Sequence, residues 1–212
     1  MAYDEDEQVE RLQKWWSENW KPLIGGLVLG IGGIVGWNAW QAAQEREAEA
    51  ASNLFRNVVE ALDAGRTDGA TSAREALVAD YAGTPYAVAA SLRLAAARVE
   101  AGELDAAADL LGWARDHTDD PAMAHLATLR LARVRWAQGD ADAALAMLDE
   151  EALGPFIAVG EELRGDILVA QGQRAEALAA YRRALSGAPP ESRELLQQKV
   201  DDLADVAEVA DA

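Results

Sequence analysis

Cysteine is absent from this sequence of 212 residues, which excludes disulfides, thiolate metal sites and cysteine nucleophiles. Histidine is scarce, since the chain has only His117 and His125, and these form neither an HExxH motif nor a three-ligand set. We expect both histidines at the surface. Paired acids such as Asp119 and Asp120 are neighbours in sequence, and neighbours do not face each other across a cleft. We therefore expect a protein that is not an enzyme and that binds no cofactor and no metal ion.

Basic residues are also few, because 37 acidic residues outnumber 19 basic ones and give a net charge of −18. Such a charge repels a phosphate backbone, so nucleic acid is a poor partner. Phenylalanine and tyrosine are rare, whereas alanine and leucine are abundant, which favours helix over sheet. The length suits a short tail, one membrane span and one domain of about 165 residues, which is enough for a hydrophobic core.

Charge is missing altogether from Pro22 to Gln44. The nineteen or so residues that end at Trp40 would reach about 28 Å as a helix, close to the hydrocarbon thickness of roughly 30 Å. Tryptophans flank this run on both sides: Trp15, Trp16, Trp20, Trp37 and Trp40. The many glycines in the run would weaken a water-soluble helix by about 1 kcal/mol each. We predict a tail at residues 1–21 and a transmembrane helix at residues 22–42.

A cleaved signal peptide is the alternative, but the region before the run is acidic and the first Ala-x-Ala, at Ala48 and Ala50, lies well past it. The orientation rests on a small excess of basic residues on the N-terminal side of the span. Three lie before the span and two soon after it: Arg11, Lys14 and Lys21, then Arg46 and Arg56. This bias favours an N-terminus in the cytoplasm.

Glycines four residues apart occur twice in the span, as Gly26 with Gly30 and as Gly32 with Gly36. Small residues at this spacing let a second helix approach closely in lipid. The alternative is that glycine is simply common in spans, and the sequence leaves both open. At about 100° per residue, Gly26, Gly30 and Gly33 share one face, which is our candidate helix-docking face.

A sequence repeat of about 34 residues occurs beyond the span. Its turn glycines are 37 and 33 residues apart, at Gly102, Gly139 and Gly172, and its prolines have a similar period. This period indicates stacked helical hairpins of the tetratricopeptide type. The predicted fold is therefore all-α, with one N-terminal transmembrane helix followed by a tetratricopeptide-like helical-hairpin solenoid. We expect connecting helices at 43–84, the repeats at 85–188, and a C-terminal capping helix and tail at 189–212.

The first helix of each hairpin is expected to line the concave face of such a stack. Aligning the turn glycines places six side chains at groove positions, and these are our candidate partner-binding residues: Arg93, Arg130, Arg133, Trp136, Glu162 and Asp166. The alternative is that some of them pack internally or pair with each other, Arg133 with Asp166 for instance.

The N-terminal block of this sequence resembles that of the YfgM family, ancillary subunits of the bacterial Sec translocon. The matching stretches are Asp6-Glu7-Gln8-Val9-Glu10, Trp15-Trp16, Glu18-Asn19, Lys21-Pro22-Leu23-Ile24-Gly25-Gly26 and Gly36-Trp37. The repeat region is also similar, at Leu129-Arg130-Leu131-Ala132-Arg133-Val134 and Leu163-Arg164-Gly165-Asp166. The resemblance covers essentially the whole chain.

The resemblance implies a single-pass inner-membrane protein with a cytoplasmic N-terminus and a periplasmic repeat domain. It also implies association with the SecYEG channel and with a membrane-anchored periplasmic chaperone of the prolyl-isomerase type. One departure is Asn38, which stands where the family often has a basic residue, and its neutrality favours the same orientation. We expect a membrane-anchored protein-interaction module that links the translocon to chaperones and emerging clients. The alternative is a structural scaffold in another envelope-assembly or divisome complex.

Overall fold

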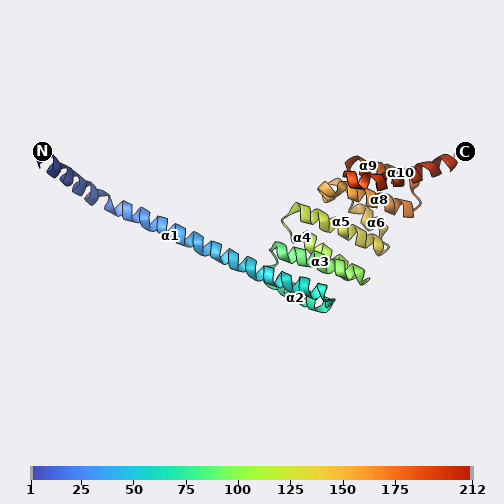
Figure 1. Cartoon of the computed structure of the whole chain (residues 1–212), viewed down its shortest axis with the longest axis horizontal. Coiled ribbons are helices and arrows are strands. Elements are labelled where there is room, and N and C mark those ends of the chain that lie inside the picture. Colours follow the sequence, from blue (N-terminus) through green and yellow to red (C-terminus); the bar gives the residue numbers. More distant parts are fainter. Residues whose placement is uncertain (1, 211–212) are drawn as a thin grey trace. The chain divides into compact units, whose positions relative to one another are not determined.

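The computed structural model describes residues 2–210, and the side chains of residues 8–204. All regular structure in residues 2–210 is helical, which confirms the predicted all-α class (Figure 1). Residues 1, 211 and 212, at the ends of the two predicted tails, lie outside the described residues. The chain divides into two units, Met1–Ala50 and Ala51–Ala212, and each is described by itself.

The first unit is formed by the N-terminal part of α1 (Ala2–Asp63). The segment Gln8–Asp63 is long and apolar enough to cross a membrane, with a mean hydropathy of 1.5 over its most apolar 18-residue window. None of that window is buried, whereas the core helix of a soluble protein would be mostly buried. The segment therefore has the properties of the predicted single span.

The second unit is a stack of antiparallel helical hairpins, with successive hairpins side by side in chain order (Figure 1). It starts with the end of α1. The remaining helices are α2 (Thr67–Tyr81), α3 (Pro85–Glu100), α4 (Leu104–Asp116), α5 (Pro121–Ala137), α6 (Ala141–Ala146), α7 (Glu150–Leu153), the 3-10 helix η1 (Gly154–Phe156), α8 (Ile157–Ala170), α9 (Arg174–Gly187) and α10 (Pro190–Ala210).

The hairpin turns repeat one backbone structure. Gly102 has φ +76°, its amide donates to the Val99 carbonyl, and the next amide, of Glu103, donates to the Arg98 carbonyl. Gly139 and Gly172 have the same left-handed conformation and equivalent hydrogen bonds. This conformation strains any residue with a side chain, which explains glycine at each turn.

The same turn also occurs at Gly65, which has φ +66° and donates to the Leu62 carbonyl. The end of α1 and α2 therefore form a hairpin of the same kind, ahead of the three that the glycine period picks out. Buried Ala51, Val58 and Leu77 pack in one core cluster with the first residues of α3. The helices expected to be connectors are thus packed into the stack.

The second helix of the α5 hairpin is broken. α6 ends after six residues, and α7 and η1 precede α8. Leu148, within the break, and Leu153, at the end of α7, are fully buried, and Arg164 of α8 donates to the Leu148 carbonyl. Tertiary contacts therefore stabilise the interruption, which the regular spacing of the repeats does not predict.

Small residues allow the paired helices to approach closely. Ala95 and Ala107 share one buried cluster, and Ala132 and Ala144 share another. Gly165 of α8 lies directly against the ring of Tyr181, where an added Cβ would come within 2.3 Å of Tyr181 Cε1. Tyr181 in turn packs on Leu196 and Val200 of α10, which closes the end of the core.

Candidate functional site

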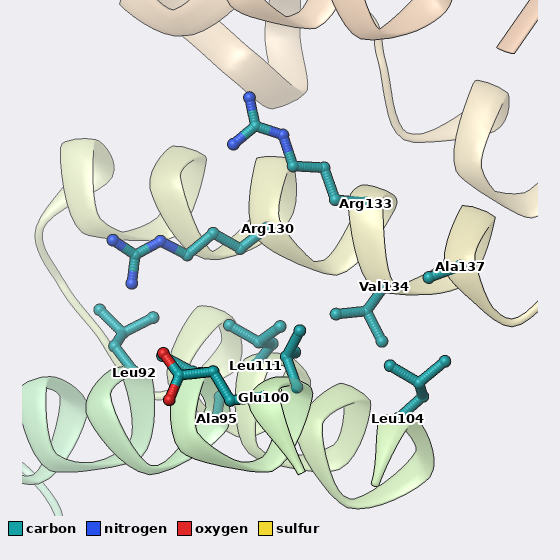
Figure 2. A pocket seen from close by; sticks show the side chains of 11 residues that line it. Leu92, Ala95, Glu100, Leu104, Leu111, Arg130, Arg133, Val134 and Ala137 are labelled. Carbon is teal, nitrogen blue, oxygen red and sulfur yellow. The ribbon is translucent and has the colours of Figure 1, made fainter. Parts of the chain in front are cut away.

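A cavity of about 350 Å³ opens between α3 and α5, with α4 behind it (Figure 2). Its lining is mostly apolar and includes Leu92 and Val99 of α3, Leu104 and Leu111 of α4, and Val134 of α5. The cavity exists because small residues fill part of both walls: Ala95, Ala96 and Ala137. Packing between the first helices of two neighbouring hairpins thus leaves a hollow with mainly apolar walls.

Three charged residues line the same cavity: Glu100, Arg130 and Arg133. All three are exposed. In Figure 2, Arg130 reaches across the cavity on the side of Leu92 and Glu100, whereas Arg133 points away from α3. A guanidinium presents several N–H donors in a planar fork, which suits carboxylates. The cavity therefore combines apolar walls with the Arg130 guanidinium and the Glu100 carboxylate, while the Arg133 guanidinium points away from α3.

Two further candidate partner-binding residues, Arg93 and Trp136, do not line this cavity. Arg93 is exposed on α3 but does not line the cavity. Trp136 is half-buried and packs against the buried cluster that contains Leu129 and Ala132. The structure thus brings together Arg130 and Arg133, and it places Trp136 partly in the core.

Glu162 and Asp166 lie against the C-terminal helix. Lys199 of α10 donates to Glu162 Oε1 at 2.8 Å and to Asp166 Oδ1 at 2.7 Å. The hydroxyl of Tyr181 also donates to Asp166 Oδ1, at 2.6 Å, and the Lys199 ammonium lies 5.3 Å from the centre of the Tyr181 ring. These two carboxylates thus hold α10, and the partners of Asp166 are Lys199 and Tyr181, not Arg133.

The protonation of this network follows from its burial and charge. Burial alone would lower the pKa of Lys199, but its hydrogen bonds to Asp166 and Glu162 outweigh burial and raise the pKa. Burial, together with the hydrogen bond to Asp166 and the charge of Glu162, raises the pKa of Tyr181. At neutral pH the lysine is therefore charged and the tyrosine neutral, as the hydrogen bonds require.

The apolar lining is the part of the site that the alignment of turn glycines missed, although it offered a signal. Val99, Trp136 and Val169 each stand three residues before a turn glycine. Val99 and Val169 are about 40% exposed, which is high for valine in a packed helix. Of these three equivalent positions, Val99 lines the cavity.

The three glycines of the candidate helix-docking face have open space around them. No heavy atom lies within 4 Å of a Cβ added at Gly26, Gly30 or Gly33. Contacts within the first unit therefore do not require glycine at these positions. A helix-docking role for them stays a prediction.

The two histidines differ in exposure. His117 is exposed and stacks on Trp113, with ring centroids 4.3 Å apart. His125 is half-buried beside Gly154, so the expectation that both lie at the surface is wrong for His125. Within the described side chains, no group of three or more His, Cys, Asp or Glu residues could hold a metal ion.

Comparisons with known proteins cover nearly the whole chain. A family model described as a tetratricopeptide repeat-like domain matches residues 13–205. The ancillary SecYEG translocon subunit of Escherichia coli is 34% identical over 201 residues, which are 94% of this chain and 97% of that protein. The protein of the same name from Haemophilus influenzae is 30% identical over 206 residues, which are 96% of this chain and 100% of that protein.

Two solved structures of MamA share the fold. Their TM-scores are 0.54 and 0.56 at 19% and 18% sequence identity. The matches cover 71% and 76% of this chain, and 85% and 90% of the MamA chains. At this identity the likeness concerns the helical stack alone.

Proposed function

This chain belongs to the tetratricopeptide repeat-like family of ancillary SecYEG translocon subunits, and from that premise we propose that it is a membrane-anchored interaction module of the Sec translocon. The resemblance of its N-terminal block and repeats to that family is confirmed. The proposed role is to bind proteins beside the channel, without catalysis of its own. Its site of action is the inner membrane, which fits the apolar helix that, in the part of the chain that the structure describes, is long enough to cross it.

The observation that carries this proposal is the cavity between α3 and α5. Its apolar lining with Arg130 and Arg133 suits a protein segment that carries apolar side chains next to carboxylates. A chain of net charge −18 repels acidic partners in general. The two exposed arginines at this cavity, Arg130 and Arg133, provide a local positive charge that attracts the carboxylates of the segment.

The proposed arrangement has the N-terminus in the cytoplasm and the repeat domain in the periplasm. The span contacts the SecYEG channel, and the repeat domain receives a membrane-anchored chaperone of the prolyl-isomerase type or a client that emerges from the channel. Support comes from the basic residues before the span and from the names of the relatives. A contact in the membrane raises the effective concentration of a second, weak contact outside it.

Charge reversal in the cavity tests the proposal. The variant Arg130→Glu/Arg133→Glu changes two exposed side chains, so we expect the helical content to be unchanged. We expect recovery of the periplasmic partner in mild-detergent co-purification to fall roughly tenfold, because two favourable charges become unfavourable.

The matched control is Arg174→Glu/Arg182→Glu, which makes the same change of charge at exposed positions of α9. It should leave recovery of the partner unchanged. If both double variants reduce recovery equally, net charge and not the cavity governs the association. If neither does, the repeat domain binds its partners elsewhere.

A further inference from the structure

The segment of α1 at residues 8–21, just before the apolar run, is strongly amphipathic. At about 100° per residue, its apolar side chains other than Trp15 fall within an arc of roughly 80°: Val9, Leu12, Trp16 and Trp20. Its charged side chains fall within an arc of about 100° on the opposite side: Glu10, Arg11, Lys14, Glu18 and Lys21. Trp15 lies between the two faces. A chain segment that merely leads into a span does not need this separation.

The apolar face is uncovered in the first unit. Val9, Leu12 and Trp16 have between half and two thirds of their surface exposed. Tryptophan has an apolar body and a polar N–H, and it prefers the boundary between lipid headgroups and acyl chains. An apolar face with tryptophans and a charged opposite face is the pattern of a helix that lies in that boundary.

The helix is weakened where this segment joins the apolar run. Pro22 has no N–H, so the Glu18 carbonyl loses its helical donor. Ser17 Oγ donates to the Lys14 carbonyl at 2.8 Å, and Asn19 Nδ2 donates to the Trp15 carbonyl at 2.8 Å. Side-chain hydrogen bonds to helix carbonyls favour bending, and so does proline.

We propose that residues 8–21 form an interfacial helix that lies along the membrane surface, with Val9, Leu12, Trp16 and Trp20 in the lipid and a change of direction at Pro22. This proposal rests on the membrane anchoring proposed above. Lipid is the occupant that fits, because the same bilayer that receives the span lies directly beside this face. The segment holds three basic and two acidic side chains between residues 8 and 21, so apolar burial and not anionic lipid drives the binding.

The test uses single cysteines, which the chain otherwise lacks. Full-length protein in vesicles of zwitterionic lipid carries an environment-sensitive fluorophore at Val9→Cys or Leu12→Cys on the apolar face. Glu10→Cys and Lys14→Cys are the matched controls on the polar face. We expect quenching by aqueous iodide to be roughly threefold weaker at the apolar positions, with quenching by brominated lipid in the opposite order. Pro22→Ala should reduce this difference.

A label at Val28→Cys separates this proposal from the anchoring itself, because Val28 lies within the apolar run. Protection of Val28 from iodide, with equal aqueous quenching at all four positions before Pro22, would overturn the interfacial helix and leave the span intact. Exposure of Val28 would overturn the anchoring and this proposal with it. Protection of Val28, Val9 and Leu12 together, with Glu10 and Lys14 exposed, supports both.

Discussion

Lys199 shows how one side chain fixes the end of the stack, since it bridges Glu162 and Asp166 of α8 from α10. Replacing it by methionine leaves two half-buried carboxylates without that donor. We expect Lys199→Met to lower the free energy of unfolding by about 1–2 kcal/mol. Urea unfolding of the full chain in mild detergent measures this. Adding Glu162→Gln and Asp166→Asn should restore part of the loss, and no restoration would mean that packing of the lysine stem, not charge, is responsible.

The same network predicts how stability depends on pH. The folded state raises the pKa of Lys199 above its ordinary value of 10.5 and that of Tyr181 above 10.0. Both groups keep their protons more tightly when folded, so their contribution is complete below about pH 10 and is lost as the pH rises through the folded values. We expect unfolding midpoints that fall above pH 10, and a smaller fall in Lys199→Met. An equal fall in both would assign the alkaline transition to other groups.

Two helical glycines provide a matched pair for packing. A Cβ at Gly165 meets the Tyr181 ring, whereas a Cβ at Gly112 of α4 meets nothing within 4 Å. We expect Gly165→Ala to destabilise the domain by about 1–3 kcal/mol through overpacking. Gly112→Ala should stabilise it by roughly 0.5–1 kcal/mol, because alanine favours helix. Thermal unfolding of the two variants measures both changes in stability. If Gly165→Ala and Gly112→Ala change the stability by similar amounts, the close packing at Gly165 is contradicted.

At the scale of helices, the sequence predicts what the backbone dictates locally. A turn glycine ends a helix whatever surrounds it, so the spacing of Gly102, Gly139 and Gly172 is enough to place three hairpins. The break after α6 is only partly local: Asp149 caps α7 by accepting from the Ala152 amide, and Gly154, with φ +46°, ends α7 before Pro155. The rest of the interruption depends on the burial of Leu148 and Leu153 and on Arg164 from another helix.

Part of the candidate site is likewise predictable from local sequence, and part depends on contacts between residues far apart in the chain. The repeat register places Arg130 and Arg133 on the first helix of a hairpin, and both line the cavity. The same register includes Trp136, but the half-burial of its large ring depends on Leu129 and other neighbours in space. Similarly, nothing local reveals that Glu162 and Asp166 accept hydrogen bonds from Lys199, because more than 30 residues separate them from it.

The span gives a prediction of its own. If Gly26, Gly30 and Gly33 form a helix-docking face, leucine at all three should keep the protein in the membrane and reduce its co-purification with SecYEG several-fold, because the helices can no longer approach closely. The control carries Val28→Leu, Ile31→Leu and Val35→Leu on the opposite face, and it should behave as the unchanged chain. If the unchanged chain, the glycine variant and the control recover equal amounts of SecYEG at matched membrane abundance, the three glycines do not contribute to docking.

At the scale of the whole molecule, we expect the charges on either side of the span to set its orientation. Residues 1–21 hold three bases, and only Arg46 and Arg56 follow within about 20 residues of the span. We expect the repeat domain to lie in the periplasm, so protease added to spheroplasts should digest it. Intact cells should protect it. Full protection in spheroplasts, while a resident periplasmic protein is digested, would place the domain in the cytoplasm.

The physical cause of that orientation is testable separately, because the bias of three bases against two is small. Lys14→Gln and Lys21→Gln remove two positive charges from the N-terminal side, and Asn38→Arg adds one beside Trp37. Together they reverse the bias to one base against three, and residues 22–37 stay free of charge. We expect a measurable fraction of this variant to hold its repeat domain in the cytoplasm, where protease cannot reach it. The control Gln13→Lys strengthens the original bias and should give full digestion. If the reversed variant is also fully digested, orientation is set by the folded domain or by the translocation machinery and not by the flanking charges.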